Sequence, residues 1–251
     1  MAGVVHLIGA GPGPADLLTL RAARLLGEAD IVFHDALVSD EVLALATRAR
    51  RVSVGKRAGL PSTDQAFINR QIVNAARRHG VVVRLKGGDP MLFGRAQEEI
   101  AACRAAGIAV EVTPGVSAAF AAAASLCASL SQRLVSRSVV FVTPAKARGA
   151  QADFAWADAA AAADTAVLYM GKADAKLIRE ALSQRGVSQA TPVVIAESVA
   201  RPEEALRGGI LADLPALAAE TGDGPALVLI GAAFAEAAAA TDRTDRAILR
   251  A

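Results

Sequence analysis

The chain has 251 residues, of which 53% are hydrophobic, 4% are aromatic and 21% are charged, with a formal net charge of +2. This length and apolar fraction indicate a globular α/β or α protein with a sizeable core. The small net charge, and the lack of a basic stripe with interleaved aromatic residues, argue against a nucleic-acid partner.

The N-terminal sequence MAGVVHLIGAGPG has neither a charged start nor a long apolar stretch, so we expect no signal peptide. Apolar runs such as AAFAAAASLCASL fall short of the roughly 18 residues that would suggest a membrane span. The two cysteines, Cys103 and Cys127, lie far apart in predicted helices and indicate buried thiols in a reducing compartment. Three histidines without clustered cysteine argue against a metal site. We therefore expect a cytoplasmic protein with no membrane partner and no metal.

In the first half of the chain, β-branched apolar runs alternate with helical patterns. The predicted strands are Val4–Ile8, Asp30–Phe33, Arg51–Val54, Val81–Leu85 and Val110–Val112. The predicted helices are Ala15–Gly27, Asp40–Ala46, Thr63–His79 and Arg95–Ala106. This alternation with short connections predicts βαβ units and a mostly parallel sheet.

The second half also alternates, but with different turns. The predicted strands are Ser138–Thr143, Thr165–Met170, Pro192–Glu197 and Ala226–Gly231, with a helix at Ala173–Arg185. A β-hairpin is expected near Val199–Leu211, with its turn or bulge at Gly208-Gly209. The fold class is therefore α/β with two α/β domains, at residues 1–114 and 115–240, followed by a charged tail at 241–251.

Four glycine- or proline-marked turns follow predicted strands in the first domain: Gly9–Gly13, Gly55–Gly59, Gly87–Pro90 and Pro114-Gly115. Ligands of open α/β sheets bind at this end of the strands, so the four turns together indicate a ligand site. The first turn reads G-x-G-x-G, which departs from the G-x-G-x-x-G of dinucleotide-binding domains, and nothing matches a P-loop. Asp89, in the third turn, is a candidate either to hydrogen-bond a ligand or to cap the following helix.

Six motifs then occur in a fixed order: GAGPGPADLLTL, HDALV, VGKRAG, RLKGGDPMLFGRAQEE, VTPGVSA and LYMG. In this order and spacing the chain closely resembles the tetrapyrrole (cobalamin and sirohaem) methyltransferase family, in particular its uroporphyrinogen-III C-methyltransferases. The resemblance runs from Val4 to Phe234. It implies a homodimer of two-domain subunits with S-adenosylmethionine, which leaves as S-adenosylhomocysteine, held in a cleft between the domains.

The resemblance also implies roles for individual residues. Asp35 aligns with the family's proposed proton acceptor, and Lys56 aligns with its proposed proton donor. The residues implied to bind the methyl donor are Pro12, Gly87, Gly88, Asp89, Leu92, Ser117, Ala118, Met170, Ala196 and Val199. The implied substrate, uroporphyrinogen III, carries eight carboxylates, which arginine binds well through its planar fork. The candidate arginines are Arg57, Arg84, Arg95, Arg133 and Arg137.

Three segments depart from the family pattern. The usual YDRLV reads HDALV here, so Ala36 replaces an arginine beside the acid. The usual GIPLTHR reads CASLSQR from Cys127 to Arg133, and VTGH reads VTPA. Because several of these positions belong to the substrate side, three hypotheses follow. The first is C-methylation of uroporphyrinogen III at C-2 and C-7 to precorrin-2, the second is methylation of another tetrapyrrole, and the third is a cofactor-binding relative without turnover.

Overall fold

The computed structural model describes residues 3–55, 64–144 and 153–242. The chain divides into two compact units, Met1–Ala118 and Ala119–Ala251. The division falls four residues after the expected boundary at Pro114, inside a helix that begins at Ala118. Each unit contains its own five-stranded sheet.

The N-terminal unit has a parallel sheet of order β3-β2-β4-β1-β5. Its strands are β1 (Val4–Gly9), β2 (Ile31–His34), β3 (Arg50–Ser53), β4 (Val81–Lys86) and β5 (Val110–Thr113). Its helices are α1 (Leu20–Glu28), α2 (Asp40–Ala44), α3 (Gln65–Ala76) and α4 (Ala96–Ala105). Since all five strands run in one direction, their carboxyl ends share one edge of the sheet.

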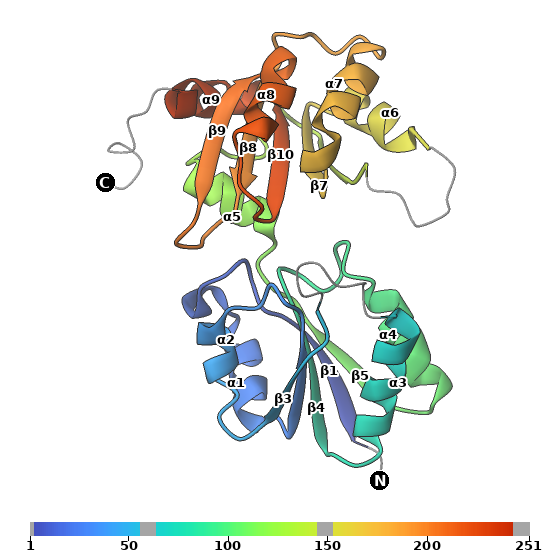
Figure 1. The fold of residues 1–251 in the computed structure, drawn as a ribbon. Helices are drawn as coiled ribbons and strands as arrows, with labels where there is room; N and C mark the ends of the chain where they lie inside the picture. The colour runs from blue at the N-terminus through green and yellow to red at the C-terminus, as the bar shows by residue number, and fades with distance from the viewer. Residues whose placement is uncertain (1–2, 56–63, 145–152, 243–251) are drawn as a thin grey trace. The chain divides into compact units, whose positions relative to one another are not determined.

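Helices cover both faces of this sheet (Figure 1). On one face, Phe33 and Val82 pack with Ile72 of α3 and Ile100 of α4. On the other face, the strand residues that point away from α3 and α4 pack with α1 and α2. The two-residue alternation of a strand thus produces a three-layer α/β/α unit, which confirms the parallel α/β prediction for this half.

The helix expected at Ala15–Gly27 begins later than its sequence pattern suggests. Ala15–Leu17 forms one turn of 3₁₀ helix, and α1 starts only at Leu20. Thr19 determines this start, because its hydroxyl accepts a hydrogen bond from the backbone N–H of Ala22 at 3.1 Å. An N-cap threonine satisfies one of the free amides of the first turn.

The C-terminal unit has a mixed sheet of order β6-β7-β10-β8-β9. Its strands are β6 (Val139–Val142), β7 (Thr165–Tyr169), β8 (Pro192–Glu197), β9 (Ala205–Ile210) and β10 (Ala226–Gly231). Its helices are α5 (Ala118–Ser125), α6 (Ala155–Ala162), α7 (Ala175–Ser183), α8 (Leu214–Ala219) and α9 (Ala235–Asp242). A core of small and branched residues joins one face of the sheet to α6, α7 and α8.

The position of the hairpin turn predicted near Val199–Leu211 was wrong. Gly208 and Gly209 lie within β9, which pairs antiparallel with β8 along its length, so the connection lies between Glu197 and Ala205. Gly208 is needed for packing: a Cβ there would lie 2.2 Å from the carbonyl oxygen of Ala238 in α9. A glycine inside a strand often marks such a close backbone approach.

Candidate active site

Three loops meet at the carboxyl edge of the N-terminal sheet, after β1, β4 and β5. Gly11 and Gly88 form an isolated antiparallel bridge, with N–H···O distances of 3.2 Å and 2.7 Å. A Cβ on Gly9 would lie 2.6 Å from the Cα of Gly115 and from the carbonyl oxygen of Gly88. Backbone therefore packs directly on backbone here, which only glycine permits. Three of the four predicted turns thus lie side by side.

Asp89 ties two of these loops together. Its Oδ1 accepts a hydrogen bond from the N–H of Met91 at 2.8 Å, and its Oδ2 accepts one from the N–H of Gly115 at 3.0 Å. Sequence reasoning left a ligand role and a capping role open for this residue. The structure gives Asp89 a loop-joining role, and its half-exposed position leaves further oxygen lone pairs for a ligand.

The loop between Asp89 and α4 has two residues in the left-handed region, Phe93 with φ +52° and Arg95 with φ +55°. Such conformations in non-glycine residues tend to cluster at ligand-binding sites. Leu92 lies in this loop and is partly exposed, whereas Pro12 is buried in the β1 loop. Ser117 is also buried and precedes Ala118, the first residue of α5. All of these positions lie on the segments at the carboxyl edge.

Asp35 follows β2 at the same edge, and its N–H donates to the carbonyl oxygen of Leu85 at 3.2 Å. Its carboxylate is 32% exposed and accepts a hydrogen bond from Nη2 of Arg84 at 2.5 Å. Arg84 also donates from Nε to Glu99 Oε1 at 2.9 Å. Lys86 donates to the other oxygen of Glu99 at 3.0 Å. A chain of charged groups thus runs from the partly exposed Asp35 into the core.

The expectation that Arg84 binds substrate carboxylates needs correction. Its side chain is only 3% exposed, because the two-residue alternation of β4 turns it toward α3 and α4, and its donors are bound within the protein. Burial opposes the charge of Arg84, yet the carboxylates of Asp35 and Glu99 raise its pKa above the ordinary value. Burial lowers the pKa of Lys86, and the charge of Arg84 adds to that effect.

The remaining candidate arginines differ in their surroundings. Arg95 is exposed and pairs with Glu98 at 2.7 Å and 2.8 Å. Arg133 and Arg137 are exposed residues of the C-terminal unit, and the backbone N–H of Arg137 donates to Asp164 at 2.9 Å. Lys56 and Arg57 lie outside the described residues, so their predicted roles stay predictions.

In the C-terminal unit, three of the residues expected to bind the methyl donor lie toward one edge of the sheet. Leu227 of β10 pairs with Tyr169 on one side and with Ala196 on the other, so the ends of β7 and β8 coincide. Met170 follows β7, is 55% exposed and has φ +56°. Val199 follows β8 and is buried, and the side chain of Ala196 is fully buried. Of these three, Met170 offers the most accessible side chain.

Two residues that sequence reasoning missed organise this edge. Glu197, at the end of β8, accepts hydrogen bonds from the N–H groups of Gly222 and Gly224 at 2.8 Å and 2.9 Å. Lys172 donates to Glu197 at 3.0 Å and to the carbonyl oxygens of Gly222 and Gly224. Together they hold the loop before β10 beside the end of β8. The neighbouring Ser198 has φ +50°, a further left-handed residue at this edge.

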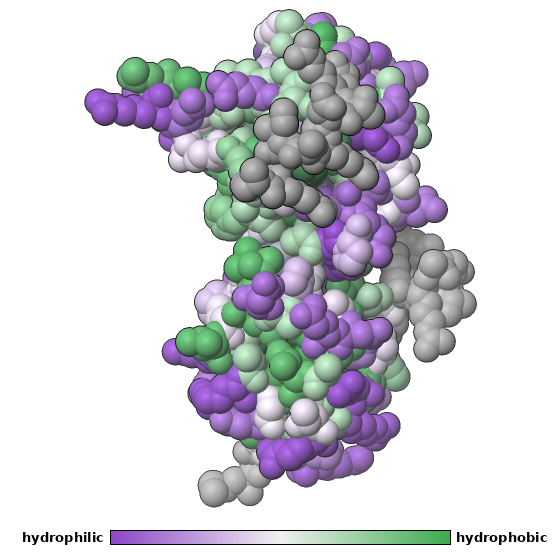
Figure 2. Space-filling model, turned by 90° about the vertical axis from the view of Figure 1, so that its left-hand side faces the viewer, coloured by the Kyte–Doolittle hydropathy of each residue, from purple (hydrophilic) through white to green (hydrophobic). Residues whose placement is uncertain are grey.

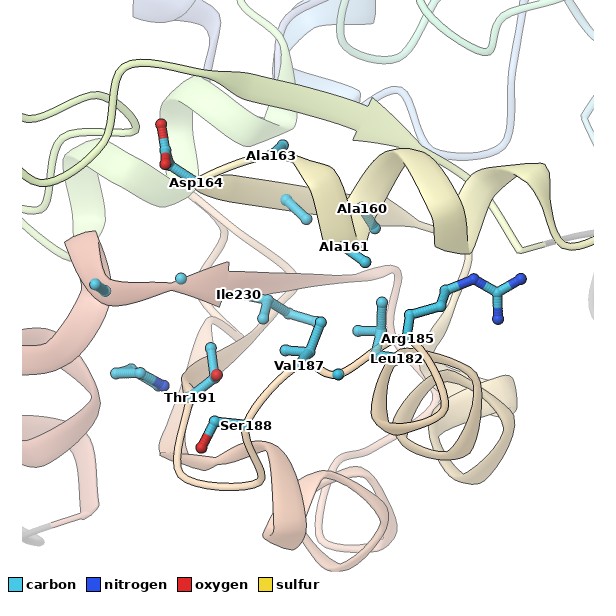
Figure 3. Close-up of a pocket in the computed structure, with 15 residues that line it drawn as sticks. Ala160, Ala161, Ala163, Asp164, Leu182, Arg185, Val187, Ser188, Thr191 and Ile230 are labelled. Atoms are coloured by element: carbon cyan, nitrogen blue, oxygen red, sulfur yellow. The ribbon is translucent and has the colours of Figure 1, made fainter.

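A pocket of about 330 Å³ also lies in the C-terminal unit (Figure 3). It is lined by the end of α6, by Leu182 and Arg185 of the α7 region, and by Ile230 of β10. Asp164 and Gly231, which also line it, lie at the start of β7 and the end of β10. The pocket is therefore at the opposite edge of this sheet from Met170 and does not include the candidate donor residues.

Across the described ranges, no cluster of three or more His, Cys, Asp or Glu side chains is placed to hold a metal ion. No helix in the same ranges is long and apolar enough to cross a membrane. Hydrophilic residues are spread over both units on the face shown in Figure 2.

A family model described as tetrapyrrole (corrin/porphyrin) methylases matches residues 4–215. The chain belongs to the tetrapyrrole methylase family. It is 44% identical over 230 residues to "Siroheme synthase 3" of Aeromonas hydrophila subsp. hydrophila, covering 91% of this chain and 49% of that protein. It is 43% identical over 231 residues to "Siroheme synthase" of Pseudomonas fluorescens, covering 91% of this chain and 50% of that protein. The chain thus spans about half the length of the curated relatives it matches.

Solved structures of tetrapyrrole methylases have the same fold. A uroporphyrin-III C-methyl transferase from Thermus thermophilus, complexed with S-adenyl homocysteine, is 36% identical with a TM-score of 0.80, and the match covers 92% of this chain and 98% of that one. A cobalt precorrin-4 methyltransferase is 28% identical with a TM-score of 0.80, covering 92% of this chain and 95% of that one. The predicted fold class, two α/β domains of the tetrapyrrole methylase fold, is confirmed.

Proposed function

We propose that this chain is an S-adenosylmethionine-dependent C-methyltransferase that methylates uroporphyrinogen III at C-2 and C-7, giving precorrin-2 by way of precorrin-1. The observation that carries the proposal is the match over nearly the full length of both chains to a uroporphyrin-III C-methyl transferase complexed with S-adenyl homocysteine. The siroheme synthase relatives support a place in sirohaem or cobalamin biosynthesis. We also propose that the protein is a cytoplasmic homodimer.

The shape of the N-terminal loops fits S-adenosylmethionine, the methyl donor, because it allows a ligand to approach the backbone closely. Gly9, Gly11, Gly88 and Gly115 pack without side chains, and the loop at Gly87–Asp89 is half-exposed. A Cβ at Gly88 would meet nothing closer than 3.9 Å, so space remains on that side of the loop. We assign the donor's amino-acid portion to this loop and its adenine to Met170, whose side chain is exposed. The full set assigned to the donor is Pro12, Gly87, Gly88, Asp89, Leu92, Ser117, Ala118, Met170, Ala196 and Val199.

When bound, S-adenosylmethionine supplies a methyl group already activated by the sulfonium, so the chain's own residues have to orient the substrate and exclude water. Methylation of a pyrrole carbon leaves a proton to be removed from the macrocycle, which calls for a base. Asp35 suits that role because its carboxylate is partly exposed at the carboxyl edge while Arg84 holds one of its oxygens. Lys56 is assigned as the proton donor by resemblance.

The substrate's carboxylates need cations that are accessible. Arg95, Arg133 and Arg137 have exposed side chains and remain assigned to the substrate, together with Arg57. The salt bridge between Arg95 and Glu98 is exposed, so substrate carboxylates can displace Glu98 at a small free-energy cost. Arg84 leaves this set because its donors are bound inside the protein.

A second tetrapyrrole remains a candidate substrate. The chain is also similar in fold to a cobalt precorrin-4 methyltransferase, with a TM-score of 0.80. Ala36 and the segment Cys127–Arg133 depart from the pattern expected of uroporphyrinogen-III enzymes. These positions lie outside the donor loops, so they bear on the choice of acceptor.

The experiment is to incubate purified protein anaerobically with S-adenosylmethionine and either uroporphyrinogen III or a methylated precorrin. We expect S-adenosylhomocysteine and methylated product with uroporphyrinogen III. Product with the precorrin alone would favour the second candidate. Donor binding without product from either would leave the hypothesis of a cofactor-binding relative.

Two variants, one at each end of β2, test whether Asp35 is the base. Asp35→Asn should lower turnover with little change in affinity for S-adenosylhomocysteine. Asp30→Asn, the same substitution just before β2, should leave turnover unchanged at neutral pH, because Asp30 caps the amides of Gly80 and Val81 at the opposite edge of the sheet. Equal turnover in the two variants would remove Asp35 from the mechanism.

A further inference from the structure

Glu99 is a fully buried carboxylate that no step of the proposed mechanism uses. It lies on α4, and its side chain is 0% exposed. Three side chains donate to it: Arg84 Nε at 2.9 Å, Lys86 Nζ at 3.0 Å and Gln65 Nε2 at 3.2 Å. Both carboxylate oxygens are therefore engaged, from β4 on one side and from α3 on the other.

Arg84 connects this buried carboxylate to the site. Its Nε is bound to Glu99, its Nη1 donates to the carbonyl oxygen of Leu85 at 3.0 Å, and its Nη2 donates to Asp35. Because the guanidinium group is planar, three fixed nitrogens leave it a single orientation. The direction from which Asp35 is held is thus determined by the buried end of the arginine.

The charges of the cluster balance only when Glu99 is included. Arg84 and Lys86 contribute two positive charges, and Asp35 and Glu99 contribute two negative ones. Without Glu99, two buried cations would share one half-exposed carboxylate. Lys86 would then have no described carboxylate partner of its own.

A purely structural requirement here would be met by apolar residues at Arg84, Lys86 and Glu99 together. The neighbouring α4 positions that face the same core are Ala96, Ile100 and Cys103, all buried. Burying a carboxylate with two cations costs desolvation free energy that a hydrophobic residue avoids. A buried carboxylate that reaches the site through Arg84 therefore indicates a function in orienting charge.

We propose that Glu99 is a positioning residue that fixes the guanidinium of Arg84 and, through it, the carboxylate of Asp35. The proposal rests on the function proposed above, in which Asp35 is the base. Glu99 acts at a distance from substrate and donor, so its loss should affect turnover more than donor binding.

The first test replaces Glu99 by glutamine, which keeps the shape and removes the charge. We expect kcat to fall by about 10- to 100-fold, as for a displaced catalytic group, while the Kd for S-adenosylhomocysteine stays within about twofold. Glu28→Gln is the matched control, because Glu28 is an exposed α1 residue of the same unit that pairs with Arg24. Unchanged kcat in Glu99→Gln would overturn the proposal.

A second variant separates positioning from structural support and serves if Glu99→Gln fails to fold. Glu99→Leu combined with Lys86→Met removes one charge of each sign and keeps the cluster balanced and packed. If Glu99 were only structural, kcat would return to the level of Lys86→Met alone, and that recovery would refute the proposal. We expect kcat to stay at least about tenfold below that level, because Arg84 still lacks its buried partner.

A readout that does not need activity separates this proposal from the function on which it rests. The Arg84 Nε–H should give a slowly exchanging side-chain NMR signal in the wild type, since it is bonded to a buried carboxylate. In the balanced double variant its exchange should accelerate by at least about tenfold, whereas Glu28→Gln should leave it unchanged. If exchange is faster in the double variant but the wild type has no methyltransferase activity, the proposed function is refuted and the positioning role of Glu99 stands. Unaltered exchange would count against the positioning role itself.

Discussion

Gly9→Ala is a direct perturbation of the loop cradle in the N-terminal unit. The added Cβ would lie 2.6 Å from the Cα and N of Gly115 and from the carbonyl oxygen of Gly88. These atoms belong to backbone and cannot swing aside as a side chain does. They must move by about 0.8 Å to reach ordinary contact at 3.4 Å, which shifts the β1, β4 and β5 loops apart.

The cost of this overpacking should be about 1–3 kcal/mol of unfolding free energy. Since the proposed donor site is built from the same loops, we expect affinity for S-adenosylhomocysteine to fall at least about tenfold, equivalent to about 1.4 kcal/mol. The matched control is Gly27→Ala in α1, where an added Cβ meets nothing within 4 Å. There the lower helix propensity of glycine predicts a gain of about 0.5–1 kcal/mol and unchanged donor affinity.

Calorimetry with S-adenosylhomocysteine measures the affinity, and hydrogen exchange of the β1 amides measures the local stability. Hydrogen exchange is preferable to fluorescence, because the single tryptophan, Trp156, lies in the C-terminal unit. Wild-type affinity in Gly9→Ala together with unchanged β1 exchange would show that the three loops neither pack as described nor hold the donor.

Three further predictions concern other parts of the chain. Asp89→Ala should weaken S-adenosylhomocysteine binding in calorimetry, because it removes the link to the N–H of Gly115; unchanged affinity would move the donor away from this loop. The structure buries Cys103 but leaves Cys127 exposed, so the prediction of two buried thiols was wrong for Cys127. Burial raises the pKa of Cys103 to about 11, so a thiol reagent should modify only Cys127 in the folded protein and both cysteines in urea; two reactive thiols before unfolding would contradict this. The backbone N–H groups of Val81 and Gly80 hold the pKa of Asp30 below its ordinary 3.8. The ionised carboxylate of Asp30 therefore stabilises the folded state above pH 3.8, and this stabilisation is lost as the pH falls through the lower pKa of the folded state. Urea unfolding should therefore show the wild type losing stability relative to Asp30→Asn below pH 3.8, and parallel curves would refute the assignment.

Much of the N-terminal unit followed from periodicity in the sequence. Apolar runs at Val4–Ile8 and Val81–Leu85 are buried strands, and short glycine turns mark the carboxyl edge where β1, β4 and β5 end. The later start of α1 was not visible in the apolar pattern, because the capping hydrogen bond that the hydroxyl of Thr19 accepts from the N–H of Ala22 outweighs it. The two glycines of β9 resembled a turn because their close packing against α9 is a tertiary constraint.

The exposed part of the site was easier to predict than its buried support. Asp35 and the glycine loops lie in recognisable motifs. Glu99 ends the motif RLKGGDPMLFGRAQEE and lies in the first turns of α4, but the motif does not show that its carboxylate is buried. A signal was nevertheless present: Glu99 falls on the same helix face as Ala96, Ile100 and Cys103, and Arg84 and Lys86 alternate along a buried strand. Charged residues at core positions of a helix and an adjacent strand suggest pairing, but their partners depend on sheet order, which the sequence alone does not specify.

The proposed reaction is tested most directly with S-adenosylmethionine labelled with ¹³C in its methyl group, together with uroporphyrinogen III. NMR of the product identifies the carbons that receive the label. We expect two labelled methyl groups, at C-2 and C-7, with one S-adenosylhomocysteine released for each. Label at other carbons, or release of S-adenosylhomocysteine only with a different tetrapyrrole, would contradict it.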